Sequence, residues 1–258
     1  MSKKELKNKP LVEAIVEIRW RLSSPHPGVQ VDPHYKLLLG RLYDRLAKEY
    51  PEHEQLATAA VPDELVGQVV QHRFRCAQDD WPLIQVGPGI LTVNDTAKYT
   101  WDDFSKRSTQ AVITLFEAYP KPPELGVSGL VLRYIDAVAF DYTNEDSFAF
   151  LREKMRVSLV LPAELFAATD VEQKPSEFNW QASFQCQCPK GRVFVRFATG
   201  KRADEPVLMW ETMVQSSDHD VPSMPGGFAA WIEAAHNITD DWFFKLIAGE
   251  LERRFSSD

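Results

Sequence analysis

Residues Pro10 to Leu22 read P-L-V-E-A-I-V-E-I-R-W-R-L, with apolar and charged side chains in alternation. One side of an extended chain here holds Val12, Ala14, Val16, Ile18, Trp20 and Leu22. The other side holds Glu13, Glu17, Arg19 and Arg21. A period of two residues predicts a β-strand that buries its apolar side and turns its charged side away from the core. We expect this strand to lie near the centre of a sheet.

The same pattern returns in the second half of the chain. Residues Val127 to Phe140 read V-S-G-L-V-L-R-Y-I-D-A-V-A-F, and an amphipathic helix is predicted after each of the two strands. The segment P-K-P-P at Pro120 to Pro123 separates the repeats. The chain therefore reads as two related halves, residues 1–124 and 125–258, which together form one compact duplicated domain.

Each half follows the order β-α-β(3–4)-α. In the first half we expect a helix that Asp32 caps, a short strand within residues 56–61, strands over 69–76, 83–86 and 90–93, and a helix over 101–119. In the second half we expect a helix over 145–157, strands over 180–188, 192–198 and 207–215, and a terminal helix over 228–255 that bends near residues 237–240. Residues 161–178 interrupt the order as an insertion, with a short helical piece at 163–168, and such insertions often carry a specific function.

This repeated order resembles the TATA-binding-protein-like and helix-grip folds. The resemblance implies an α+β protein in which a curved antiparallel sheet is backed by helices on one face and open on the other. A fold does not determine a function. The acidic charge of this chain also argues against transferring the DNA-binding role of the first fold.

Four motifs resemble a sporadically distributed bacterial family of uncharacterised proteins of roughly 250 residues, close to the 258 residues of this chain. They are N-x-P-L-V-E-A-I-V-E-I-R-W (Asn8 to Trp20), Q-V-G-P-G-I-L-T-V-N (Gln85 to Asn94), L-R-Y-I-D (Leu132 to Asp136) and W-I-E-A-A-H-N-I-T-D-D-W-F-F (Trp231 to Phe244). The resemblance implies no established activity. A patchy distribution is typical of phage-defence and toxin-antitoxin genes.

The composition excludes several classes of protein. With 44% hydrophobic and 26% charged residues the chain is typical of a soluble globular protein, and no apolar run is long enough to span a bilayer. The polar segment Met1 to Lys9 lacks the apolar core of a signal peptide, and three cysteines do not form a disulfide framework, so we expect a cytoplasmic protein without a membrane partner. A net charge of -8 disfavours nucleic acid as a partner.

The sequence carries no recognisable enzyme motif. G-x-G-x-x-G, G-x-x-x-x-G-K-[ST], H-E-x-x-H and G-x-S-x-G are all missing, and the six histidines show no metal-ligand spacing. His219 in D-H-D is predicted to lie in a solvated loop, Cys186 and Cys188 lack a second ligand pair, and the seven tryptophans are predicted to pack in the core. We therefore predict no catalytic residue, no metal and no cofactor, and the balance is against an enzyme.

The charged side of the predicted strands is the candidate binding site. Arginines can bind an anionic ligand through bidentate guanidinium contacts, and two glutamates share the same side. The candidate ligand-binding residues are Glu13, Glu17, Arg19, Arg21, Arg73, Arg75, Arg133, Arg192 and Arg196. The alternative is a cross-strand lattice in which these arginines pair with Glu13, Glu17, Asp136 and Glu211 and bind nothing.

Two functions follow from these observations. The first is a non-catalytic binding or protein-interaction module, such as a component of a phage-defence or toxin-antitoxin system, whose partner is another protein or a second copy of itself. The second is a sensor or enzyme that binds a nucleotide or another phosphorylated small molecule on the arginine-lined face of the sheet. Direct binding of nucleic acid ranks below both.

Overall fold

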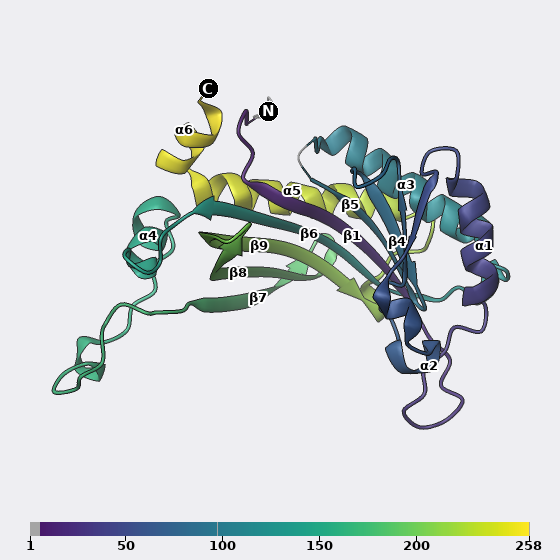
Figure 1. Ribbon diagram of the computed structural model, residues 1–258, viewed down its shortest axis with the longest axis horizontal. Helices are drawn as coiled ribbons and strands as arrows, with labels where there is room; N and C mark the ends of the chain where they lie inside the picture. Colours follow the sequence, from purple (N-terminus) through teal and green to yellow (C-terminus); the bar gives the residue numbers. More distant parts are fainter. Residues whose placement is uncertain (1–5, 97, 258) are drawn as a thin grey trace.

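The computed structural model describes residues 6–96 and 98–257, so the first five residues of the polar N-terminal segment lie outside it. The fold is α+β, with one nine-stranded antiparallel sheet whose longer helices pack on one face (Figure 1). The strands are β1 (Leu11–Trp20), β2 (Glu52–Gln55), β3 (His72–Arg75), β4 (Leu83–Gly87), β5 (Ile90–Asp95), β6 (Val127–Ala139), β7 (Asn179–Gln187), β8 (Lys190–Arg202) and β9 (Glu205–Ser217). The α-helices are α1 (Tyr35–Leu46), α2 (Asp63–Val66), α3 (Trp101–Ala118), α4 (Ser147–Lys154), α5 (Phe228–Ile247) and α6 (Glu250–Ser256).

The strand order is β2-β3-β4-β5-β1-β6-β9-β8-β7. β1 is hydrogen-bonded to β5 on one side and to β6 on the other, which confirms the prediction that the strand of Pro10 to Leu22 lies at the centre. Within each part of the chain the first strand lies beside the last: β1 beside β5, and β6 beside β9.

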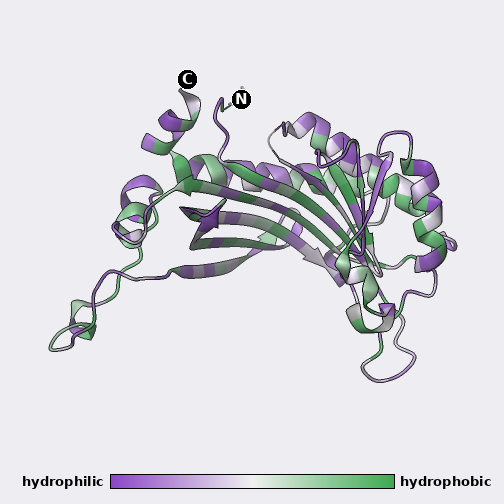
Figure 2. Cartoon of the chain, viewed as in Figure 1, coloured by the Kyte–Doolittle hydropathy of each residue, from purple (hydrophilic) through white to green (hydrophobic). Residues whose placement is uncertain are grey.

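The helix-covered face of the sheet holds the core, and the alternation of β1 explains how. Val16, Ile18 and Trp20 are fully buried against α1, α3 and α5, as part of the larger apolar cluster. A second cluster lies around Trp210 and Phe197 at the other end of the sheet, under α4, α6 and the end of α5. Figure 2 shows the alternation as green and purple bands along the central strands.

Within the described residues no helix combines the length and apolarity needed to cross a bilayer.

The C-terminal helix breaks at a different place from the predicted one. α5 is continuous through residues 237–240 and ends at Ile247, and α6 begins at Glu250. Gly249, between them, has φ +121°, a conformation that side-chain-bearing residues rarely adopt. The sequence signal for the break was therefore this glycine. Of residues 237–240, Asn237, Thr239 and Asp240 line a cavity and Ile238 packs against the core.

Two smaller predictions, on a short strand and on a helix cap, were wrong. Residues 57–60 form a 3₁₀ turn instead of a strand, and the strand of this region is β2 at residues 52–55. Asp32 does not cap α1, whose N-cap residue is His34 without a side-chain cap. Asp32 instead accepts hydrogen bonds from the His34 backbone N–H, from Trp20 Nε1 and from the Tyr119 hydroxyl.

The insertion between α4 and β7 forms an arm that extends away from the body of the molecule (Figure 1). A 3₁₀ turn at Ala163–Leu165 is its only regular element among the described residues, at the position where a short helical piece was predicted. Large apolar side chains of the arm are exposed, with Val160 at 85% and Val171 at 61% of their accessible surface.

Candidate functional site

The predicted site residues lie on the face of the sheet that carries no helix. In β1 they alternate with Val16 and Ile18, which pack under the helices, and the cross-strand register extends this helix-free face to the neighbouring strands. The face holds Glu13, Glu17, Arg19, Arg73, Arg75, Arg133, Arg192 and Arg196. Arg21 follows the end of β1 and lies 3.6 Å from Asp218, with both side chains mostly exposed.

Most of the arginines on this face already have an acceptor. Arg133 lies 2.8 Å from Glu211, and Arg19 donates to Glu17 with an Nε–Oε2 distance of 2.9 Å. Arg73 and Arg75 share Glu54, while Arg196 donates to the side-chain oxygen of Asn179. Glu13 accepts from Asn94 instead of from an arginine. Within the described residues Arg192 makes no hydrogen bond or ion pair. The pattern is that of the cross-strand lattice, in which an anion would compete with internal carboxylates.

The sheet also separates these residues widely. Arg73 and Arg75 lie on β3, whereas Arg192 and Arg196 lie on β8, six strand spacings away. At about 4.8 Å per spacing the two pairs are about 29 Å apart. They therefore cannot bind one small ligand together, and only Glu13, Glu17, Arg19 and Arg133 come from adjacent strands.

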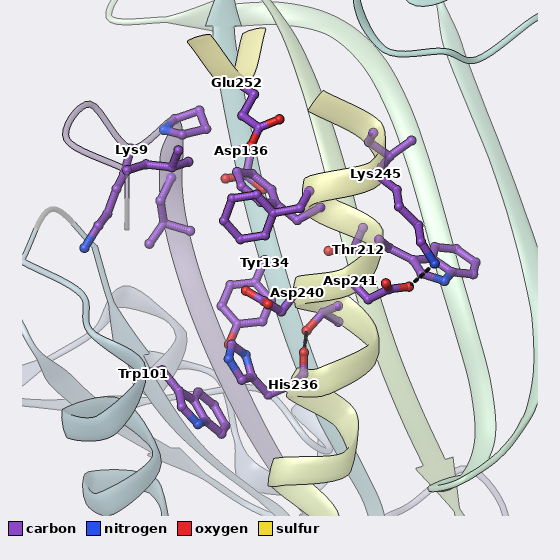
Figure 3. A pocket seen from close by; sticks show the side chains of 18 of the residues that line it. Lys9, Trp101, Tyr134, Asp136, Thr212, His236, Asp240, Asp241, Lys245 and Glu252 are labelled. Carbon is purple, nitrogen blue, oxygen red and sulfur yellow. Dashed lines mark hydrogen bonds and ion pairs between the residues drawn. The ribbon is translucent and has the colours of Figure 1, made fainter. Parts of the chain in front are cut away.

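Asp136 does not belong to this lattice, which corrects the alternative that we drew from the sequence. Asp136 follows Leu132 and Tyr134 on β6 at two-residue intervals, so its side chain lies on the same side of the strand and faces the helices. There it lines a cavity of about 1530 Å³ between α5 and the sheet, which the start of α3, α6 and the segment before β1 also border. Figure 3 shows Asp136, Tyr134, Asp240 and His236 along one side of α5.

A row of hydrogen-bonded aromatic side chains runs along one end of the cavity. The Tyr99 and Tyr134 hydroxyl oxygens lie 2.8 Å apart, and the Tyr134 oxygen lies 3.1 Å from His236 Nδ1. The His236 ring stacks on Trp101, with 3.7 Å between ring centroids, and Trp101 Nε1 donates to Glu233. Burial raises the pKa of both tyrosines far above the ordinary value, so both phenols are neutral at pH 7.

Asp136 is the most unusual group in the cavity wall. Its side chain is 3% exposed, and within the described residues its Oδ2 atom has no hydrogen-bond partner. Burial away from water raises the pKa of this carboxyl to about 8, so the folded protein keeps it protonated at neutral pH. Buried polar atoms are nearly always hydrogen-bonded, so this oxygen marks a place where a partner is missing.

Sequence reasoning missed this site although the signal was present. Asp136 falls two residues after Tyr134 and two before Val138, which places a carboxylate on the apolar side of an otherwise regular strand. His236 lies in the terminal motif four residues before Asp240, so both project from one face of α5. Trp101 was predicted to lie in the core and is indeed 8% exposed, but it also lines the cavity.

The remaining predicted positions form no site. The His219 side chain is 91% exposed and lies 3.5 Å from Asp220. All three cysteines are unpaired, and Cys188 is exposed. In the part of the chain that the structure describes, no three His, Cys, Asp or Glu side chains come together as a metal site.

The cavity and the helix-free face are thus two separate candidate surfaces on opposite sides of one sheet.

A comparison of the chain with models of protein families gives no match, and a comparison with curated proteins gives none either.

Proposed function

We propose that the protein is a non-catalytic binding protein that holds a small organic molecule in the cavity between α5 and the sheet. The observation that carries this proposal is Oδ2 of Asp136, buried in the cavity wall without a partner among the described residues. A volume of about 1530 Å³ leaves room for a ligand, since cavities for drug-sized molecules span about 300–1,000 Å³.

The rest of the cavity wall supports binding better than catalysis. The hydroxyl groups of Tyr99 and Tyr134 are bonded to each other and to His236, so they form a rigid wall. Their raised pKa values keep both phenols protonated at neutral pH, so no phenolate is available as a general base. Trp101 and Trp242 add aromatic surface on which an apolar ligand can pack.

A thermal-shift screen of small organic molecules tests the proposal, with a variant that obstructs the cavity. Asn237 is an exposed residue of α5 that lines the cavity, so Asn237→Trp adds bulk there without disturbing the core. Ala230→Trp is the matched control, since Ala230 is exposed on the same helix away from the cavity. A ligand at a hundredfold excess over Kd stabilises the protein by about 2.7 kcal/mol. We expect hits that Asn237→Trp abolishes and Ala230→Trp retains; no hits, or hits insensitive to Asn237→Trp, contradict the proposal.

Contact with a second protein chain is the second candidate function, and the edge strand β7 favours it. β7 reads N-W-Q-A-S-F-Q-C-Q, without a charge, a proline or a glycine, and it is largely exposed. The opposite edge, β2, is only four residues long and contains two glutamates. Proteins usually protect an exposed edge by shortness, charge or proline, and β7 has none of these protections. We assign as its partner the β7 strand of a second copy, paired antiparallel about a two-fold axis.

Sedimentation analysis of a charged β7 variant tests this pairing. Ser183 lies in the middle of β7 and is exposed, so Ser183→Lys brings two like charges together across the two-fold axis. Ala229→Lys, on the exposed side of α5, is the control of equal charge. We expect a dimer for the natural chain and for the control, and a monomer for Ser183→Lys. A monomeric natural chain at 100 μM, or a dimer that Ser183→Lys leaves intact, overturns the pairing.

The finer features inferred from the sequence remain proposals with different support. The duplicated, TATA-binding-protein-like or helix-grip arrangement is supported by the strand order, in which each half places its first strand beside its last. A cytoplasmic location rests on the cysteine content. A role in bacterial defence or toxin neutralisation rests on the family resemblance alone.

A phosphorylated ligand on the helix-free face is the weakest candidate, because internal acceptors already engage most of the arginines on that face.

A further inference from the structure

The charged groups around the cavity are mostly carboxyls. Among the described residues they are Asp102, Asp240, Asp241 and Glu252, against the basic groups Lys9, Arg156 and Lys245, while Asp136 is protonated at neutral pH before binding. Each of the three basic groups has a partner already: Lys245 lies 2.6 Å from Asp241, Lys9 donates to the Tyr99 backbone oxygen, and Arg156 donates to the Ala248 backbone oxygen. Once Asp136 is ionised in the complex, five carboxylates face three basic groups among the described residues, so the lining favours a positively charged ligand.

Aromatic rings provide the second requirement for binding a cation. Six aromatic side chains line the cavity together with His236: Tyr99, Trp101, Tyr134, Trp242, Phe243 and Phe244. The face of an aromatic ring attracts an ammonium group, and the same rings pack against an apolar body. Leu6, Leu11 and Met155 extend this apolar surface, so the cavity has both an apolar part and a polar part.

We infer that the ligand of this cavity is an organic ammonium ion with an apolar body, whose N–H groups bind the buried carboxylate of Asp136. The inference rests on the proposed function and specifies the ligand class for the same site. An anionic ligand is disfavoured because it would lie among the carboxyl groups, and a purely apolar ligand leaves Oδ2 of Asp136 without a partner.

Binding requires Asp136 to lose its proton. Its pKa of about 8 means that the carboxyl is protonated at pH 7 before binding. The ammonium ion stays charged, the O–H bond of the carboxyl breaks, and one proton leaves to the solvent as the ion pair forms. The other titratable and charged groups lining the cavity are Lys9, Tyr99, Asp102, Tyr134, Arg156, His236, Asp240, Asp241, Lys245 and Glu252. We therefore expect the affinity for an amine to rise about tenfold per pH unit between pH 6 and pH 8, and then to level off.

Calorimetry with matched pairs of probes tests the inference. The probes are phenethylamine, tryptamine and dodecylamine, each compared with the alcohol of the same skeleton. Titration at pH 7 in two buffers of different ionisation enthalpy measures proton release. We expect at least one amine to bind at least tenfold more tightly than its alcohol, with release of about one proton.

Two substitutions assign the effect to one carboxyl. Asp136→Asn keeps the shape of the side chain and removes its charge, so the preference for the amine and the proton release should both disappear. Asp95→Asn is the matched control, because Asp95 is also 3% exposed and on the helix-facing side of the sheet but does not line the cavity. It should leave both quantities unchanged.

The outcomes separate this inference from the proposed function. If amines and alcohols bind equally well and Asn237→Trp abolishes both, the cavity binds small molecules but the ammonium inference is wrong. If amines bind better and Asp136→Asn retains the preference, Asp136 is not the acceptor and the inference is also wrong. If none of the probes and none of the screened compounds binds, both proposals fail.

Discussion

The Tyr134 hydroxyl oxygen on β6 lies 3.1 Å from Nδ1 of His236 on α5, and this hydrogen bond ties the helix to the sheet beside the cavity. Tyr134 is also bonded to Tyr99. Tyr134→Phe therefore removes two hydrogen bonds and should lower the free energy of unfolding by about 2 kcal/mol, whereas Tyr99→Phe removes one and should cost about 1 kcal/mol. Urea denaturation measures both values.

The double variant distinguishes a connected row from two independent bonds. Once Tyr134 is phenylalanine, the Tyr99 hydroxyl has lost its partner in the row, so replacing it as well should cost little more. The combined loss should stay close to that of Tyr134→Phe alone. A strictly additive loss of about 3 kcal/mol contradicts the connected row.

Asp136 should make the protein less stable as the pH rises. Its folded pKa of about 8 lies above the ordinary value of 3.8, so the folded state holds a proton that the unfolded state releases between about pH 4 and pH 8. The stabilisation that comes from this retained proton is fully present below pH 4 and is lost as the pH rises toward 8. Asp136→Asn removes this penalty and should stabilise the protein by up to about 4 kcal/mol at pH 7, since one pKa unit corresponds to about 1.4 kcal/mol.

The measurement is the difference in unfolding free energy between Asp136→Asn and the natural chain across pH 4 to 9. We expect this difference to grow up to about pH 8 and to stay constant above it. A difference that does not change with pH would show that the folded and unfolded states hold the proton equally.

Gly87 and Gly40 should respond in opposite directions to the same substitution. A Cβ atom on Gly87 would lie 1.8 Å from the Val69 backbone oxygen, so Gly87→Ala forces the β4–β5 hairpin away from the preceding loop. A Cβ atom on Gly40, in α1, meets nothing within 4 Å. We expect Gly40→Ala to stabilise by about 0.5–1 kcal/mol through helix propensity, and Gly87→Ala to destabilise by more than about 3 kcal/mol. Thermal unfolding of both variants checks the pair.

Asp32 should matter more for the core than for the start of α1. Its carboxylate accepts from Trp20 Nε1 at 2.8 Å and from the Tyr119 hydroxyl at 3.1 Å, and it is itself nearly buried. Asp32→Asn retains one oxygen but presents an N–H group to a donor, so we expect a loss of about 2–3 kcal/mol. Near-ultraviolet circular dichroism of the tryptophans should change as well. A loss below about 0.5 kcal/mol would mean that these bonds add nothing to stability.

The repeated strand pattern was sufficient to predict the α+β sheet and the central place of β1. Period-two alternation depends only on which side of a strand is buried, so β1, β6 and the three strands of the C-terminal part were found within a few residues. Short exposed elements such as β2, with the sequence E-H-E-Q, carry no such alternation of apolar residues and were not found. The break at Gly249 depends on a single backbone conformation that the apolar stripe of the helix conceals.

The candidate site was harder to predict, because it depends on contacts between distant parts of the chain. The sequence correctly placed the arginines opposite the apolar side of their strands, but it could not show that Glu54 and Glu211 lie beside them. Tyr134 and Trp101 contact His236, and Asp136 lines the same cavity, only after α5 packs on the sheet, and the separation of these residues along the chain conceals this arrangement. The sequence showed that Asp136 lies on the apolar side of its strand. This position indicates a binding site only when a cavity is known to lie beside it.

The position of β1 between β5 and β6 has a consequence for the synthesis of the chain. Translation produces β1 first, yet both neighbouring strands follow only after residue 89, and the second is complete at residue 139. At about 5–20 residues per second, the apolar side of Pro10 to Leu22 emerges several seconds before either edge can pair. Among the nine strands, the one at the centre of the finished sheet is therefore the one that waits longest for its neighbouring strands, and its apolar side is open to chaperones and to aggregation during that time.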